Sequence, residues 1–421
     1  MKTPERGGTG RGERALRAAF ARAFGGRAPA GIARAPGRIN LIGEHTDYNG
    51  LPVLPFALPR AIRIAFAPRG DAAIVLRHGR EGHPPREFTA SPAIEPDPPG
   101  SWANYVKAAV EHFARLLLET PGASVRGFDA AVDGDIPQAG GLSSSSALVV
   151  AAALTFREVN ALSMAPLEFA ARCAAAERYV GTQGGTQGGG MDQAASILGA
   201  PGCALRIDFF PLAAAPVPFP EGYAVLACHS LVRAAKTEAA RAEFNRRVGE
   251  CRAAAALLGR AFDRPELPRL GDFAREFGTE ACLRALGEAV PPDSKILARA
   301  RHVFEEAERV VAATRALAAG DMPALGRLMS EAHASARDLY EISAPALEEL
   351  VRIFLEGGAL GARLTGAGFG GFAIALGEED ALTRLMAVID ERFYRPRAPA
   401  GPIEELRFIA RPAEGARVVP A

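Results

Sequence analysis

The chain of 421 residues contains very little lysine. Only four of its 49 basic residues are lysines, at positions 2, 107, 236 and 295, and the others are arginines. The 48 acidic residues bring the formal net charge to +1, so the sequence has no strong basic field. This balance argues against a nucleic-acid or anionic-membrane partner, because both attract proteins through excess positive charge.

Features of a metal centre, a secreted scaffold or a membrane protein are also missing. The five cysteines are widely spaced without a CxxC pair, and the seven histidines form no HExxH motif. We therefore expect neither a disulfide framework nor a zinc site. The apolar run at 147–156 has only ten residues, which is too short to cross a bilayer, and no apolar leader is visible at the N-terminus. We expect a cytoplasmic protein.

Length and a hydrophobic content of 48% predict a large core. Helical and strand patterns interleave without regular βαβ alternation, so we predict an α+β fold in two lobes. We place the first domain at residues 1–212 and the second at 213–421, with the proline-rich stretch 211–220 crossing between them. Strands are predicted at 61–67, 72–77, 127–133, 204–210, 223–229, 361–376 and 406–411. Helices are predicted at 16–24, 102–117, 145–156, 166–180, 237–262, 294–319, 323–339 and 379–393.

The segment GGLSSSSA at 140–147 is a candidate phosphate-binding loop. Glycines allow the backbone to approach an anion, serine hydroxyls add donors, and a following helix presents unpaired N–H groups. Four serines in succession exceed what a helix cap needs. No lysine lies within thirty residues of the segment, which excludes a Walker A loop, and the VAIK and HRD sequences of protein kinases are absent.

Two further segments carry a weaker signal. The stretch GARLTGAGFGGF at 361–372 is glycine-dense, but by itself it indicates only a tight turn between strands. The stretch 34–50 holds Arg38, Glu44, His45 and Asp47 within ten residues after a Pro-Gly pair that predicts a turn. Alternating donors and acceptors of this kind suit the hydroxyl groups of a sugar.

Together the three segments resemble the GHMP kinases, and RINLIGEHTDYNG at 38–50 is similar to the galactokinase signature of that superfamily. GLSSSSA and LTGAGFGG are similar to its second and third motifs. The resemblance continues in WANYV at 102–106, GMDQ at 190–193, FNRR at 244–247 and DLYEIS at 338–343. It covers roughly residues 30–412 in the expected order.

The resemblance implies a two-lobed sugar kinase with the active site between the lobes. Such an enzyme transfers the γ-phosphoryl group of ATP to the anomeric hydroxyl of α-D-galactose. By the same resemblance Asp192 is the catalytic base, with Arg38 beside it. Sugar hydroxyls would be bound by Glu44, His45, Asp47, Gly189 and Phe244.

The resemblance also implies ATP and Mg²⁺ as cofactors. Ser146 and Glu177 would contact the metal ion. Trp102 corresponds to an aromatic residue near adenine, although simple core packing explains it equally well. The remaining ATP contacts would come from the second motif, that is from Gly140, Gly141, Leu142, Ser143, Ser144, Ser145 and Ser146. A monomer is expected.

Two departures from the family pattern bear on function. The sequence TQGG occurs twice between Glu177 and Asp192, at 182–185 and 186–189, and we expect activity to survive this insertion. Phe244 stands where many galactokinases have a tyrosine, which leaves N-acetylgalactosamine open as an alternative substrate. A non-catalytic sensor of galactose and ATP is a third possibility. It is disfavoured because Ser146 and Ala147 are both present.

Overall fold

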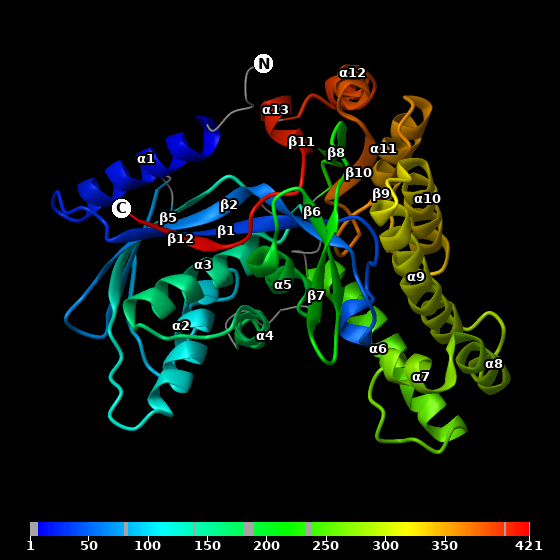
Figure 1. Ribbon diagram of the computed structural model, residues 1–421, viewed down its shortest axis with the longest axis horizontal. Helices are drawn as coiled ribbons and strands as arrows, with labels where there is room; N and C mark the ends of the chain where they lie inside the picture. Colours follow the sequence, from blue (N-terminus) through cyan, green and yellow to red (C-terminus); the bar gives the residue numbers. More distant parts are fainter. Residues whose placement is uncertain are drawn as a thin grey trace.

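The computed structural model describes residues 7–79, 83–137, 140–179, 189–232, 238–399 and 401–420. Helices and strands interleave in two lobes, each built on its own antiparallel or mixed sheet (Figure 1). The expected α+β class is therefore confirmed. A buried apolar cluster centred on the first sheet continues into residues of the second lobe, including Phe372 and Ile374, so the two lobes share part of one core.

The first lobe contains a six-stranded sheet in the order β12-β1-β2-β5-β3-β4. All neighbouring strands are antiparallel except β3 and β5, which are parallel. Every residue of β1 is buried, since helices cover both faces of the sheet (Figure 1). The strands are β1 (Gly31–Asn40), β2 (Pro55–Pro68), β3 (Ala73–His78), β4 (Arg86–Thr89), β5 (Phe128–Gly134) and β12 (Arg417–Pro420).

Within the described residues, five helices and a hairpin complete the first lobe. Helix α1 packs Leu16 and Phe20 on one face of the sheet, and α2 and α3 lie on the other face (Figure 1). Pro166 occupies the first turn of α4, where its missing N–H costs nothing. The helices are α1 (Gly7–Ala23), α2 (Ala103–Leu118), α3 (Ser144–Val159), α4 (Pro166–Ala176) and α5 (Met191–Leu198), and the hairpin pairs β6 (Cys203–Asp208) with β7 (Ala213–Pro218).

The second lobe contains a four-stranded antiparallel sheet in the order β11-β8-β10-β9. Its strands are β8 (Tyr223–His229), β9 (Gly361–Leu364), β10 (Phe372–Glu378) and β11 (Arg407–Ala410). Its helices are α6 (Glu238–Ala261), α7 (Leu270–Phe277), α8 (Thr279–Ala289), α9 (Lys295–Ala318), α10 (Met322–Asp338), α11 (Pro345–Glu356), α12 (Glu379–Ile389) and α13 (Ile403–Leu406). A short turn of helix, η1 (Asp47–Asn49), lies between β1 and β2 of the first lobe, and two more, η3 (Asp390–Tyr394) and η4 (Arg395–Arg397), follow α12 in the second lobe.

Two local expectations were wrong. Pro36 and Gly37 form no turn but lie inside β1, where the pairing register with β2 shifts between Pro36 and Arg38. A bulge of this kind accommodates a proline, which cannot donate to the ladder. The stretch 211–220 is not a simple crossing either, because it contains β7, a strand whose Pro216 and Pro218 hid it from a propensity argument.

Strand pairing also bears on the expected domain boundary. Residue 212 lies in the turn between the paired strands β6 and β7, so a division there would split a hairpin. The last strand, β12, pairs with β1 and therefore belongs to the first sheet (Figure 1). A division that follows the sheets would lie after Pro218 and would return residues 417–420 to the first lobe.

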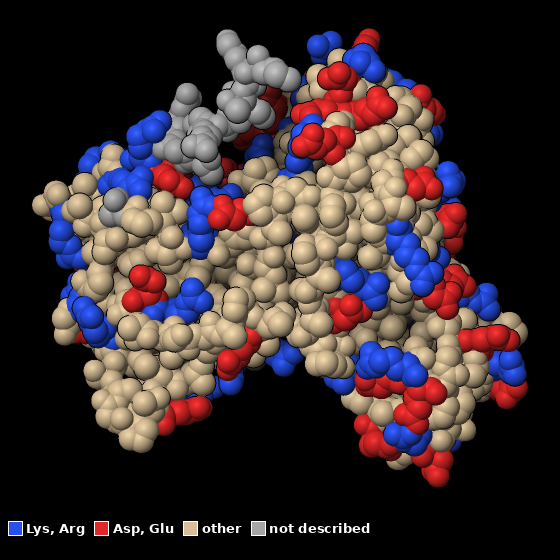
Figure 2. Space-filling model, in the orientation of Figure 1, with Lys and Arg blue, Asp and Glu red and all other residues tan. Residues whose placement is uncertain are grey.

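Surface charge is mixed on the face shown in Figure 2, where acidic and basic side chains alternate over both lobes. The same view shows a hollow at the lower edge, between the first lobe and the arm formed by α6, α7 and α8. Among the described residues, no helix is long and apolar enough to cross a bilayer.

Candidate active site

The second motif forms a tight loop ahead of α3. Ser143 adopts a left-handed conformation with φ of 63°, and α3 begins at the next residue. The hydroxyl of Ser143 is buried and has no hydrogen-bond partner in the described part of the chain. A buried, unpartnered hydroxyl beside a helix N-terminus fits an anion such as phosphate.

The third motif packs directly against this loop. The backbone N–H of Phe372 donates to the carbonyl oxygen of Gly140 at 3.2 Å. Gly366, with φ of 85°, lies so close that a Cβ atom there would approach the carbonyl oxygen of Gly141 at 2.7 Å. The two glycine-rich motifs, distant in sequence, therefore form one backbone-to-backbone contact between the lobes.

Arg38 connects the second motif to the proposed base. Its Nη2 lies 2.7 Å from Oδ1 of Asp192, and its Nη1 donates to the carbonyl oxygen of Gly141 at 2.5 Å. The Arg38 side chain is 5% exposed, whereas that of Asp192 is 29% exposed. Asp192 lies in the first turn of α5, and its carboxylate is partly exposed among the described residues. The arrangement places a fixed positive charge between a carboxylate and the loop expected to hold phosphates.

Ser146, Glu177 and Asp192 lie together on three helices or helix ends. The hydroxyl of Ser146 donates to Oε2 of Glu177 at 2.7 Å and lies 3.5 Å from Oδ2 of Asp192. The side-chain amide of Gln193 also donates to Glu177. Burial raises the pKa of Glu177 to about 7; the hydrogen bond from Ser146 opposes this rise, and the charge of Asp192 adds to it. A nearby cation would favour the ionised form.

Asp47 and Gly189 contact each other. The N–H of Gly189 donates to Oδ2 of Asp47 at 3.0 Å, and the N–H of Met191 lies at 3.4 Å from the same oxygen. Burial raises the pKa of Asp47, and the charge of Asp192 raises it further. A Cβ atom on Gly189 would approach the backbone carbon of Asp47 at 2.5 Å, so this contact requires glycine. Residues 180–188 lie outside the described residues, and with them most of the doubled TQGG.

Glu44 has its carboxylate inside the protein. Its Oε2 lies 2.6 Å from Nη2 of Arg363, and its Oε1 accepts from the backbone N–H of Gly366 at 2.9 Å. Glu44 and Arg363 are 1% and 0% exposed. Burial raises the pKa of Glu44, and the charge of Arg363 opposes that rise. A sugar contact by Glu44 stays a prediction; the observed contact is with the second lobe.

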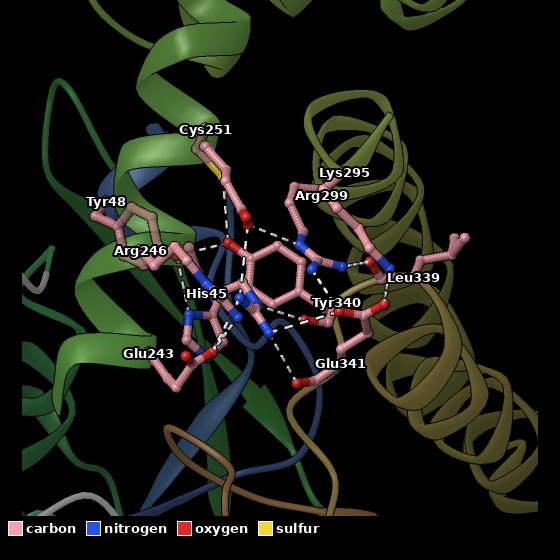
Figure 3. A network of polar contacts seen from close by, with 12 residues as sticks. His45, Tyr48, Glu243, Arg246, Cys251, Lys295, Arg299, Leu339, Tyr340 and Glu341 are labelled. Atoms are coloured by element: carbon pink, nitrogen blue, oxygen red, sulfur yellow. Dashed lines mark hydrogen bonds and ion pairs between the residues drawn. The ribbon is translucent and has the colours of Figure 1, made fainter. Parts of the chain in front are cut away.

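His45 and Phe244 come together as the resemblance implies, with ring centroids 5.0 Å apart. Both imidazole nitrogens of His45 already have protein partners. Nδ1 lies 2.9 Å from the hydroxyl of Tyr48 (Figure 3). Nε2 lies 3.2 Å from the carbonyl oxygen of Ala367. Burial lowers the pKa of His45 to about 3. Its expected role as a sugar ligand therefore stays a prediction.

Trp102 immediately precedes α2 and is partly buried against the core of the first lobe. Its ring contacts the ring of His78 edge-on, at 5.5 Å between centroids. Its indole N–H is buried with no hydrogen-bond partner in the described ranges. Core packing is thus observed, and the adenine contact stays a prediction.

Several residues at the site were not singled out by sequence reasoning. Gln193 binds Glu177, and Arg363 binds Glu44. Tyr48 and Tyr340 connect to His45, with hydroxyl oxygens 2.7 Å apart. Only their position in the sequence could have indicated a functional role, since each of these residues lies in or beside one of the segments on which the resemblance rests.

Comparison with known proteins agrees with this arrangement. Residues 18–68 match the family model described as the galactokinase galactose-binding signature. Residues 104–200 match the N-terminal domain of GHMP kinases, and residues 313–395 match their C-terminal domain. A galactokinase of Chloroflexus aggregans is 38% identical over 374 residues, covering 88% of this chain and 90% of that protein. The chain belongs to the galactokinase family.

Membership makes the chain an ATP-dependent sugar kinase of the GHMP type, as the resemblance implied. A galactokinase of a Roseiflexus species is 39% identical over 353 residues, covering 83% of this chain and 84% of that protein. The solved structure of Lactococcus lactis galactokinase complexed with galactose matches with a TM-score of 0.82 and 29% identity, covering 96% and 99% of the two chains. Methanococcus jannaschii mevalonate kinase, at 19% identity and a TM-score of 0.58, shares the fold alone.

Proposed function

We propose that this family member transfers the γ-phosphoryl group of ATP to the anomeric hydroxyl of α-D-galactose, giving galactose 1-phosphate. The observation that carries the proposal is the position of Arg38, which contacts both Asp192 and the backbone of Gly141. One guanidinium group thus lies between the acceptor's base and the phosphate loop. Phosphoryl transfer depends mainly on such positioning and charge neutralisation.

In this proposal Asp192 orients the anomeric hydroxyl and accepts its proton, since its carboxylate is the partly exposed member of the pair with Arg38. Asp47 lies beside it, held by the N–H of Gly189, and would accept hydrogen bonds from the sugar. The loop from Gly140 to Ser143 and the first turn of α3 would hold the phosphates of ATP. Each group stays fixed by contacts with the protein, so little reorganisation accompanies the reaction.

Ser146 and Glu177 would hold Mg²⁺. The residues fit a hard cation, because the hydroxyl of Ser146 and the carboxylate of Glu177 lie 2.7 Å apart and both offer oxygen ligands. Burial raises the pKa of Glu177, and a bound cation would favour its ionised form. Within the described ranges no group of three or more acidic, His or Cys residues forms a complete metal cage. Mg²⁺ commonly needs only one or two carboxylates, with phosphates and water as its other ligands. When bound, it neutralises charge on the phosphates.

The test is ADP release with galactose, with N-acetylgalactosamine and without sugar. We expect sugar-dependent release with galactose that requires Mg²⁺. The matched variant Asp192→Asn keeps the shape of the side chain and should lose this release. ADP release equal in all three conditions would refute the kinase proposal, and near wild-type turnover in Asp192→Asn would refute the proposed base.

N-acetylgalactosamine is a second candidate substrate because residue 244 is phenylalanine. Phe244 is 6% exposed, and its ring centroid lies 5.0 Å from that of His45 and 5.9 Å from that of Tyr48. A hydroxyl missing at this position would leave more apolar room for an acetamido group. The test is the ratio of kcat/KM for galactose to kcat/KM for N-acetylgalactosamine, measured in wild type and in Phe244→Tyr. A higher ratio in the variant supports a role of Phe244 in substrate selection, and an unchanged ratio opposes it.

We also propose a monomeric, cytoplasmic protein. Light scattering of the purified chain tests the first statement, and fractionation of cells tests the second. The division into lobes after Pro218 is likewise a proposal, and limited proteolysis near residues 219–222 would support it.

A further inference from the structure

A chain of hydrogen bonds leads from α6 to the third motif through the sugar loop. We use the name sugar loop for residues 41–50. The sulfur of Cys251 lies 3.2 Å from the hydroxyl of Tyr340, and that hydroxyl lies 2.7 Å from the hydroxyl of Tyr48. Tyr48 reaches Nδ1 of His45 at 2.9 Å, and Nε2 of His45 reaches the carbonyl oxygen of Ala367 at 3.2 Å. Figure 3 shows the side chains of this chain, from Cys251 to His45, pointing toward one another.

The carbonyl at one end fixes the direction of every bond. A carbonyl oxygen can only accept, so Nε2 of His45 must carry a hydrogen. The neutral imidazole then has a bare Nδ1, which must accept from the hydroxyl of Tyr48. That hydroxyl has no further hydrogen, so Tyr340 must donate to Tyr48, and Cys251 in turn to Tyr340. Burial lowers the pKa of His45 to about 3, in agreement with a neutral ring.

Several contacts hold Tyr340, the second member of this series of hydrogen bonds, in place. Tyr340 is fully buried, and its carbonyl oxygen accepts from Nε of Arg247 at 2.7 Å. Glu341 follows with φ of 56°, and its carboxylate pairs with Lys295 and with Arg299, the latter at 2.7 Å (Figure 3). A non-glycine residue in this conformation needs surrounding contacts to hold it there. The hydroxyl of Tyr340 is therefore a fixed reference point for the sugar loop.

His45, at the other end of the series of side chains, contacts Phe244. Phe244, Arg247 and Cys251 are spaced three and four residues apart on α6, so they share one face of that helix. The His45 ring packs on both Phe244 and Tyr340, at 5.0 and 4.8 Å between centroids. A rotation of the imidazole would therefore disturb the residue proposed to select the sugar.

We propose that Tyr48 and Tyr340 are positioning residues for the sugar site, and that they hold His45 as a neutral Nε2–H imidazole with both nitrogens engaged inside the protein. His45 then acts on the sugar by placing Phe244 and the loop backbone. This inference rests on the proposed galactokinase activity only for its kinetic test.

The first measurement is the ¹⁵N spectrum of the histidine rings in the full chain without sugar, with His45 assigned from the spectrum of His45→Gln. We expect a neutral ring with the hydrogen on Nε2 in wild type. Tyr48→Phe removes the donor to Nδ1 but leaves the carbonyl of Ala367 at Nε2, so the Nε2–H form should persist while the ¹⁵N shift of Nδ1 moves toward that of a nitrogen without a hydrogen bond. Tyr340→Phe leaves the hydroxyl of Tyr48 in place, so the Nδ1 shift should stay close to that of wild type. A ring with its hydrogen on Nδ1 in wild type would overturn the proposal whether or not any variant folds.

The second measurement is the KM for galactose. Loss of one neutral hydrogen bond predicts a rise of about 3- to 10-fold in Tyr48→Phe, with kcat changed less than about twofold. The rise should be smaller in Tyr340→Phe. The control Tyr223→Phe, at the start of β8, should leave KM unchanged. Equal KM in Tyr48→Phe and wild type, or a larger rise in Tyr340→Phe than in Tyr48→Phe, would contradict the proposed direction of the chain. If wild type does not phosphorylate galactose, the proposed function fails while the spectrum still tests the hydrogen-bond chain.

Discussion

Replacing Arg363 by methionine tests how the sugar loop is attached to the second lobe. Arg363, on β9, is completely buried between two buried carboxylates. Its Nη2 lies 2.6 Å from Oε2 of Glu44, its Nη1 lies 3.4 Å from Oε1 of Glu306, and Nη1 also donates to the carbonyl oxygen of Leu41 at 3.1 Å. Glu306 additionally pairs with Arg309 at 2.8 Å, so Glu44 is the carboxylate that depends more on Arg363.

Removing one member of a buried ion pair typically costs about 3–5 kcal/mol, because the remaining charge loses its compensation. In Arg363→Met the carboxylate of Glu44 can avoid this cost by taking up a proton. The pKa of Glu44 is already raised by burial and would rise further without the arginine. A carboxyl group whose folded-state pKa lies above its unfolded value loses stability as pH rises from the unfolded pKa toward the folded one. The deficit of the variant should therefore be larger at pH 8 than at pH 5.

The measurement is the unfolding midpoint in urea at both pH values, for Arg363→Met, Glu44→Gln and the double variant. Because Glu44→Gln removes the charge that Arg363 compensates, the double variant should be less destabilised than the sum of the two single variants, by more than about 1 kcal/mol. The control Arg352→Met removes an exposed pair with Glu356 and should cost less than about 1 kcal/mol. A loss in Arg363→Met no larger than in this control, or one independent of pH, would refute the reasoning.

Three further predictions follow from the site. Asp192→Asn should lower kcat by about 10²- to 10⁴-fold, because the proposed base is lost; ADP release measures this, and a fall below tenfold would contradict it. Gly189→Ala should weaken galactose binding, since the added carbon would meet the backbone of Asp47. Titration with galactose measures this; the control is Gly70→Ala, whose added carbon meets nothing within 4 Å, and equal affinity in both variants would contradict the prediction. Burial lowers the pKa of His302 to about 4, so its contribution to stability is present above pH 6.5 and is lost as pH falls. The free energy of unfolding that is lost between pH 7 and pH 5 should therefore be smaller in His302→Asn than in wild type, by about 2 kcal/mol. An equal loss in both proteins would contradict this.

The sequence predicted most clearly what depends on neighbouring residues. The serines after Gly140 and Gly141 lie at the start of α3, as the local pattern predicted. The helix α5, which carries Asp192 in its first turn, was not predicted. The pairing of Arg38 with Asp192 came from the resemblance, because nothing in their spacing indicates that β1 and α5 lie together. Family membership supplied the long-range geometry that local patterns lack.

Other features could not be predicted, for physical reasons that differ from case to case. The Pro36-Gly37 pair predicts a turn, but Pro36 lies in β1 at a bulge, where the strand pairing does not require a backbone N–H from it. The strand β7 is poor in residues that favour strands and forms by pairing with β6. The contact of Glu44 with Arg363 joins residues on different lobes, and nothing in the sequence indicates that the fold buries both charges together.

The sugar loop belongs to the first lobe by sequence but is held mainly by the second. Glu306 accepts from the backbone N–H of Gly43 at 2.9 Å, Arg275 donates to the carbonyl oxygen of Gly50 at 2.9 Å, and Tyr340 meets the loop between these points. The base and its arginine lie on the first lobe. Asp47, through Gly189, therefore joins a loop carried by one lobe to a base carried by the other. Substitutions on α7, α9 and the segment after α10 should consequently raise KM for the sugar, because they loosen the loop proposed to bind the sugar without touching the phosphate loop.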